Sequence, residues 1–218
     1  MKTGNREINI YAPQVSDKLP AVILISEQEN AEEILKLTNA EKYILVTVGN
    51  INWNDDLSPW YMDPLYKKDK PYNGKADDFV RELEEEIIPF LNDKLKDRAE
   101  YYIIGGYSLA GLFALYSGYR CHCFKRIMSV SGSIWYPGFK EYAMTEKPGS
   151  EIEKIYFSLG DKESHTRNEM MASVEEKTAC LEAFYSEEGI NTAFEKNPGN
   201  HFQNVSERIA RAINWVIE

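Results

Sequence analysis

Ser108 stands at the point where an apolar, strand-like run gives way to a helical pattern. Residues 101–107 form the strand-like run, and residues 109–116 are apolar almost all round, as in a helix packed against a sheet. Gly106 and Ala110 lie two residues before and two after the serine, where only small side chains fit across a sharp strand-to-helix turn. Such a turn lifts the serine oxygen clear of the backbone, so we predict that Ser108 is a nucleophile.

A serine hydroxyl is a weak nucleophile until a base takes its proton, so a histidine is required within reach. The chain has three histidines, His122, His165 and His201. In enzymes built around this type of turn, the base comes last in the chain, on a loop after the nucleophile and the acid. His201 lies in such a loop, between a late strand pattern and the last helical pattern, and we predict that it is the base. The alternative is a loop histidine that makes only a local hydrogen bond.

Two carboxylates, Asp161 and Glu163, follow the strand-like run at residues 154–159. The acid of a catalytic triad accepts the second imidazole N–H, keeps the ring in the required tautomer and stabilises the imidazolium. Either residue could fill this role, and the other would then be an ordinary loop charge. The residues themselves leave the choice open.

Backbone N–H groups are expected to stabilise the oxyanion that forms when the serine attacks a carbonyl group. The first donor is the N–H of Leu109, directly after the nucleophile. The second comes from the loop after an early strand, and we place it after the strand-like run at residues 43–48, on Asn52 or Trp53. The sequence does not separate these two residues.

Four aromatic residues lie on or beside the loops that should surround the nucleophile, namely Tyr107, Trp60, Trp135 and Tyr136. Open α/β sheets bind ligands outside the carboxyl ends of their strands, so these rings could stack on a sugar or on an aryl acyl group. They could equally cover apolar surface, as large side chains do. We treat them as candidate substrate-binding residues.

Strand-like and helical patterns alternate along the chain, which predicts an α/β fold with a mostly parallel central sheet and helices on both faces. Strands are expected at residues 7–11, 19–25, 43–48, 101–107, 126–131, 154–159 and 192–195. Helices are expected at residues 30–37, 76–91, 109–116, 170–185 and 205–217. The chain of 218 residues shows no linker, so we expect a single domain over residues 1–218.

The composition of the chain limits the kinds of molecule that we expect the protein to bind. A net charge of −10 repels nucleic acid and offers no polybasic surface to an anionic membrane. The first residues lack the apolar core of a signal peptide, and no run is apolar for the roughly 18 residues of a membrane span. We therefore expect a cytoplasmic protein without nucleic-acid or membrane partners.

The cysteines are too few for a disulfide scaffold. Cys121, Cys123 and Cys180 are an odd number, and we expect reduced thiols. The segment Cys121-His122-Cys123 lacks the second cluster of ligands that a zinc site needs, so we predict neither a metal nor another cofactor.

Three segments in a fixed order, residues 105–111, 159–163 and 198–202, resemble the putative esterase family of α/β-hydrolases. This family includes feruloyl esterases, siderophore (enterochelin) esterases and S-formylglutathione hydrolases. The loop at residues 52–60 is similar to a bacterial branch of the family. The resemblance implies an α/β-hydrolase fold over most of the chain.

The resemblance also implies roles for individual residues. It identifies Ser108 as the nucleophile and His201 as the base, and it favours Glu163 as the acid, three residues after the glycine that closes the strand. Asp161 stays the alternative, since aspartate is the commoner acid elsewhere in the superfamily. Ala110 replaces the usual second glycine of the turn, and its methyl group should still fit. The chain leaves little room for a lid, so we expect a minimal lid and an open, shallow pocket.

Together these observations predict a serine hydrolase that cleaves a small or carbohydrate-linked acyl ester through an acyl-enzyme. A siderophore esterase with the same triad is less favoured, because a polyanionic siderophore would be drawn by clustered Arg and Lys residues. An acyltransferase would use the same residues with an alcohol or thiol acceptor. A catalytically silent fold that binds a sugar or a protein is the alternative of another class, since a fold alone does not prove activity.

Overall fold

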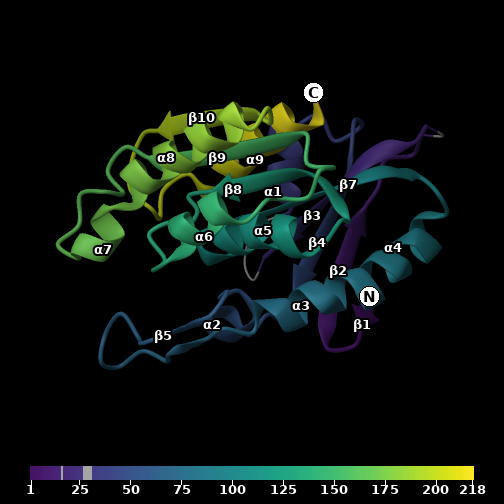
Figure 1. Cartoon of the computed structure of the whole chain (residues 1–218). Coiled ribbons are helices and arrows are strands. Elements are labelled where there is room, and N and C mark those ends of the chain that lie inside the picture. Colours follow the sequence, from purple (N-terminus) through teal and green to yellow (C-terminus); the bar gives the residue numbers. More distant parts are fainter. Residues whose placement is uncertain (16, 27–30) are drawn as a thin grey trace.

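The molecule is built around a twisted central sheet (Figure 1). The computed structural model describes residues 1–15, 17–26 and 31–218. Within these ranges the central sheet has eight strands in the order β1-β2-β4-β3-β7-β8-β9-β10. The strands are β1 (Lys2–Thr3), β2 (Arg6–Tyr11), β3 (Leu19–Ile25), β4 (Ile44–Gly49), β7 (Ala99–Tyr107), β8 (Phe124–Val130), β9 (Lys154–Gly160) and β10 (Asn191–Asn197). Strands β1, β2 and β4 pair antiparallel, and every further neighbour pairs parallel.

Helices cover both faces of the sheet, as Figure 1 shows. They are α1 (Ala31–Leu37), α2 (Trp53–Asp56), α3 (Ala76–Glu82), α4 (Ile88–Leu95), α5 (Leu109–Arg120), α6 (Phe139–Thr145), α7 (Glu169–Ala172), α8 (Val174–Glu187) and α9 (Val205–Ile217). A π-helical segment, η1 (Leu83–Ile87), joins α3 to α4. The predicted α/β fold with a mostly parallel sheet between two helical layers is therefore confirmed.

The core consists of two clusters, one on each face of the sheet, and strand β3 contributes to both. Its side chains alternate, with Val22 and Leu24 in the cluster under α1 and α9 and Ile23 and Ile25 in the cluster under α3, α5 and α8. A central strand that is buried on both faces must be apolar at every position. This explains why the run at residues 19–25 is apolar throughout.

The structure also contains elements that the sequence patterns did not indicate. Helix α6 and a two-stranded hairpin of β5 (Tyr61–Met62) and β6 (Tyr72–Asn73) are too short to show a period. The hairpin extends from one end of the molecule, at the lower left of Figure 1. The expected start of the first helix at Asn30 lies outside the described residues.

The turn between β7 and α5 is as sharp as its small residues predict. Ser108 has φ 59° and ψ −121°, a conformation that is strained for a residue with a side chain. The surrounding backbone holds it in place, since the Ser108 N–H donates to Val130 O at 3.0 Å and its carbonyl accepts from Ser133 N at 3.0 Å. A Cβ on Gly106 would lie 2.4 Å from the Ala110 Cβ, so the first of the two small positions must be glycine.

The expectation of reduced cysteines is wrong for one pair. Cys121 and Cys123 form a disulfide in the turn between α5 and β8, where their Cα atoms lie 5.4 Å apart. The bend of the chain between these two residues brings their side chains together. A Cα–Cα distance of 5.4 Å is within the normal range for a disulfide. Cys180 is free.

Among the described residues, none of the helices combines the length and the apolar character that a bilayer crossing demands.

Replacing Gly106 with Ala should destabilise the fold, because the added methyl group would meet both the side chain and the backbone of Ala110. We expect a loss of about 1–3 kcal/mol in the free energy of unfolding, measured by urea denaturation. Gly118→Ala in helix α5 is the matched control, because its methyl group would lie close to the flexible end of the Ile127 side chain, with ordinary contact to Ile152, and near no backbone atom outside its own helix. Equal stability of the two variants would contradict a tight turn at Ser108.

Candidate active site

Ser108, His201 and Glu163 meet at the carboxyl ends of parallel strands of the central sheet and form a chain of hydrogen bonds. The Ser108 Oγ lies 2.9 Å from His201 Nε2, and His201 Nδ1 lies 2.7 Å from Glu163 Oε2. Ser108 follows β7, Glu163 follows β9 and His201 follows β10. With the ring proton on Nδ1, His201 donates to the carboxylate and can accept the serine proton, as a general base must.

The carboxylate of Glu163 is buried and well supplied with donors. Its side chain is 4% exposed, and its Oε1 accepts hydrogen bonds from the Gly160 N–H at 2.6 Å, Ser131 Oγ at 2.8 Å and Arg208 Nη1 at 2.9 Å. Burial alone would raise the pKa of Glu163, but the hydrogen bond and charge of His201 and the donors Gly160 and Ser131 outweigh it and lower this pKa. The group is therefore ionised at neutral pH, as the acid of a triad must be.

Asp161, the other candidate acid, serves a different purpose. It is exposed, and its Oδ1 accepts a hydrogen bond from the Gly199 N–H at 2.9 Å. Its own N–H donates to Asn197 O at 2.7 Å. Asp161 thus ties the end of β9 to the loop that carries His201, while Glu163 is the carboxylate that the structure brings to the imidazole.

The candidate oxyanion donors fall in two different places. Leu109 is the first residue of α5, so its N–H lies at the positive end of a twelve-residue helix directly beside Ser108. The N–H of Asn52 instead donates to Asp56 Oδ2 at 2.9 Å. Trp53 begins α2 and packs against the core, and neither Asn52 nor Trp53 lines the cavity at Ser108.

Strand order explains why Asn52 and Trp53 do not line the cavity at Ser108. Strand β3 lies between β4 and β7, and Ile25 pairs opposite Gly106, beside the turn. Asn52 and Trp53 follow β4, which is separated from β7 by β3. In hydrolases with this turn, the second donor comes from the loop after the third strand.

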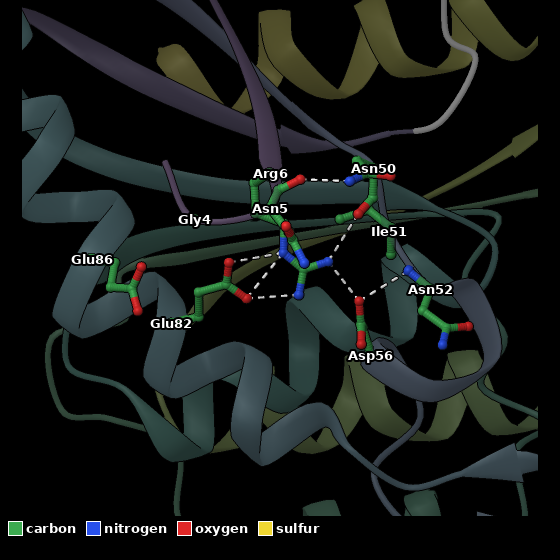
Figure 2. A pocket seen from close by; sticks show the side chains of 9 residues that line it. All are labelled: Gly4, Asn5, Arg6, Asn50, Ile51, Asn52, Asp56, Glu82 and Glu86. Atoms are coloured by element: carbon green, nitrogen blue, oxygen red, sulfur yellow. Dashed lines mark hydrogen bonds and ion pairs between the residues drawn. The ribbon is translucent and has the colours of Figure 1, made fainter. Parts of the chain in front are cut away.

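Asn52 belongs to a separate cavity of about 550 Å³, which Figure 2 shows. Arg6 lies at its centre and donates to Glu82 Oε2 and to Asp56 Oδ2, each at 2.6 Å. Its guanidinium group also lies over the ring of Phe79, 4.3 Å from the ring centre. These paired charges join β2 to α2 and α3, so the contacts of this cavity are structural.

Of the four candidate substrate-binding aromatic residues, only Trp135 lines the cavity at Ser108. Tyr136 is fully buried and donates its hydroxyl to Trp60 O at 2.7 Å. Trp60 donates its Nε1–H to Pro137 O at 2.9 Å, so this pair anchors the hairpin to the loop after β8. Tyr107 donates its hydroxyl to His201 O at 2.7 Å and holds the backbone of the candidate base.

A cavity of about 70 Å³ lies against Ser108 and His201. Its apolar wall is formed by Trp135 from the loop after β8, Met171 from α7 and Val174 from α8. The polar side carries the nucleophile candidate and the small residues Ser131, Gly132 and Ser133. Among the described residues, Ser108 is the only serine that the structure places against His201 Nε2. The cavity thus combines an apolar wall with this serine.

The sequence patterns missed Arg208, although they contain a signal for it. This residue lies on α9 three residues after Val205 and four before Ala212, and is therefore on the apolar stripe of the helix. An arginine at a core position needs buried partners, because an unpaired buried charge is costly. Here the partners include Glu163.

The depressed pKa of Glu163 predicts a pH-dependent contribution to stability. The pKa of Glu163 in the folded state lies below its ordinary value of 4.5. The ionised carboxylate therefore stabilises the fold at pH values above 4.5, and this stabilisation is lost as the pH falls through the folded-state pKa. The difference in unfolding free energy between wild type and Glu163→Gln should therefore be largest at neutral pH. Urea denaturation at about pH 7 and about pH 4 measures this difference, and a value independent of pH would contradict it.

Comparison with known proteins places these residues in a family context. The family described as Putative esterase matches residues 3–203. The protein YbbA of Bacillus subtilis, which is described as uncharacterised, is 22% identical over 99% of this chain and 94% of its own length.

Solved structures of hydrolases share the fold. An IroE-like serine hydrolase from Shewanella oneidensis has a TM-score of 0.81 at 17% identity, over 97% of this chain and 75% of that one. The siderophore hydrolase EstA of Aspergillus nidulans has a TM-score of 0.72 at 17% identity, over 97% of this chain and 94% of that one. The match to the family spans nearly the whole chain, so this protein is a member of the putative esterase family, and its activity is that of an ester hydrolase.

Proposed function

We propose that the protein is a serine hydrolase that cleaves a carboxylic ester with a small acyl group through an acyl-enzyme. Ser108 is the nucleophile, His201 the general base and Glu163 the acid. The observation that carries this proposal is the chain of hydrogen bonds from Ser108 Oγ through the imidazole to the buried carboxylate. Among the described residues, neither His122, which pairs with Glu151, nor His165 is joined to a serine in this way.

In the proposed reaction, Ser108 Oγ attacks the ester carbonyl while His201 Nε2 takes the serine proton. The oxyanion of the tetrahedral intermediate accepts a hydrogen bond from the Leu109 N–H, at the positive end of α5. Collapse of the intermediate expels the alcohol, which takes the proton back from His201, and leaves the acyl group on Ser108. Water then repeats the sequence, with His201 as base, and releases the carboxylic acid.

The size of the cavity supports a small acyl group. A protein cavity of about 150 Å³ holds one benzene molecule, and the cavity at Ser108 is about half as large, at about 70 Å³. Trp135, Met171 and Val174 close its apolar side. We infer that this space accepts an acyl chain of a few carbon atoms, and that the alcohol part of the ester, such as a sugar, extends toward solvent.

The charges near the site favour a neutral ester over a siderophore. None of the described residues that line the cavity is Arg or Lys, and the chain carries a net charge of −10. A polyanionic substrate would be repelled by this field. The siderophore hydrolases among the similar structures nevertheless make a siderophore ester a necessary member of any substrate panel.

Ser108→Ala should abolish turnover of p-nitrophenyl acetate and labelling by a fluorophosphonate, because both require the serine oxygen. Glu163→Gln should lower kcat by orders of magnitude, since loss of a triad acid costs about 10⁴-fold in a serine protease. Asp161→Asn should cost far less, because Asp161 contacts Gly199 rather than His201. Stopped-flow and steady-state kinetics of the four proteins measure these effects.

Two outcomes would contradict this proposal. If wild type and Ser108→Ala turn over the ester equally slowly and neither is labelled, the fold is catalytically silent. If Asp161→Asn costs more than Glu163→Gln, the acid is misassigned. Added alcohol acceptors distinguish hydrolysis from acyl transfer, because a transferase makes a new ester faster than it releases the acid.

Activity should fall as the acyl chain lengthens. One methylene group too many in an apolar pocket costs about 1–3 kcal/mol, so kcat/KM should drop by about tenfold or more from acetyl to butyryl esters and again to aryl acyl esters. Met171→Ala should reduce this difference in kcat/KM between short and long acyl chains, because it enlarges the cavity. Met144→Ala, at an exposed position on α6, is the matched control and should leave the difference unchanged. A wild type that prefers feruloyl or siderophore esters would contradict the proposed substrate class.

A further inference from the structure

Arg208 is a buried cation in direct contact with the proposed acid. Its side chain is 1% exposed, and its Nη1 donates to Glu163 Oε1 at 2.9 Å. The same nitrogen lies 3.0 Å from Ser131 Oγ and 3.1 Å from the Tyr107 hydroxyl oxygen. The guanidinium group thus occupies the side of the carboxylate that faces away from His201, whose Nδ1 contacts Oε2.

The second terminal nitrogen of Arg208 reaches the loop that carries the proposed base. Its Nη2 donates to Pro198 O at 3.2 Å and to Asn200 O at 2.9 Å, three residues and one residue before His201. Tyr107 adds a further link, because its hydroxyl oxygen contacts Nη1 and its proton goes to His201 O. One planar group therefore contacts the acid on one side and the base loop on the other.

The surroundings of Arg208 are shaped to admit this group. A Cβ on Gly160 would lie 2.7 Å from Nη2 and 2.4 Å from Gly199 O, so only glycine allows the guanidinium and the loop to approach β9. The arrangement is costly, since a buried charge loses its hydration and the Arg208 Nε has no partner among the described residues. An apolar side chain at this core position would avoid that cost, which points to a role beyond packing.

We propose that Arg208 is a positioning residue that holds Glu163 and the His201 loop in the geometry required for proton transfer. By occupying Oε1, it leaves Oε2 to accept the hydrogen bond from His201 Nδ1. By binding the carbonyl groups of Pro198 and Asn200, it fixes the loop from which the imidazole projects. Arg208 does not line the cavity, so it acts through these residues and not on the substrate. This inference rests on the proposed function of Ser108, His201 and Glu163.

The planar, forked shape of the Arg208 guanidinium group is essential to this role. A guanidinium group presents donors in a rigid plane and can satisfy the carboxylate and the two carbonyl groups together, whereas a lysine ammonium is a point charge on a flexible stem. We therefore expect Arg208→Met to lower kcat of p-nitrophenyl acetate hydrolysis by about 10- to 100-fold, the usual cost of losing a partner that orients a functional side chain. Arg208→Lys should recover part of the loss, and KM should change by less than about threefold in both variants.

A chemical rescue separates positioning from a general structural role. Arg208→Ala leaves a cavity in which a free guanidinium ion can bind, so guanidinium chloride at a non-denaturing concentration should raise its kcat, while the same concentration of sodium chloride should not. Arg211→Met is the matched control, since Arg211 lies on the same helix, is exposed and pairs with Glu195. It should retain the wild-type kcat.

The inference is overturned if folded Arg208→Met keeps the wild-type kcat, or if its loss lies wholly in KM. If Arg208→Met does not fold, as judged by near-UV circular dichroism, Arg208→Lys is judged by the same two criteria. Labelling of Ser108 by a fluorophosphonate distinguishes the two proposals. If the wild type is labelled and Arg208→Met retains the wild-type kcat, only the role of Arg208 is contradicted. If the wild type is neither labelled nor active, the proposed function itself is contradicted.

Discussion

An ionised carboxylate with a 4% exposed side chain persists in a protein only when donors surround it, and here the donors of Glu163 come from separate parts of the fold. Gly160 closes β9, Ser131 follows β8, Arg208 lies on α9, and His201 follows β10. The charge can be satisfied only after these elements have packed against one another. Formation of the site is therefore coupled to formation of this half of the sheet and its last helix.

A second constraint is steric, and it acts on the backbone next to the reacting groups. Gly106 lets the turn at Ser108 close onto Ala110, and Gly160 lets Arg208 and Gly199 approach β9. At both positions a methyl group would collide with the backbone. Small residues thus allow main chains to come close, and the polar side chains of the site gain their short distances from this closeness.

The positions of several predicted site residues could not be read from the sequence, because chain order does not reveal which strands are neighbours. The loop at Asn52 and Trp53 follows an early strand, but β3 lies between that strand and β7, and neither residue lines the cavity at Ser108. Likewise, Trp60 and Tyr136 are near the site in sequence, yet they pack on each other to anchor the hairpin. A large aromatic ring is satisfied by any apolar neighbour, so its type alone does not distinguish the two roles.

The sequence by itself determined the alternation of strands and helices, the sharp turn at Ser108 and the order of the proposed nucleophile, acid and base along the chain. These features are local, because they depend on the periodicity of apolar residues and on the size of immediate neighbours. Only the tertiary structure decided between Glu163 and Asp161 as partner of His201, gave Arg208 its partners and left Trp135 as the single candidate ring at the cavity. Those outcomes depend on contacts between residues far apart in the chain, such as the 38 positions between Glu163 and His201 and the 45 between Glu163 and Arg208, which only the packing of strands and helices brings together.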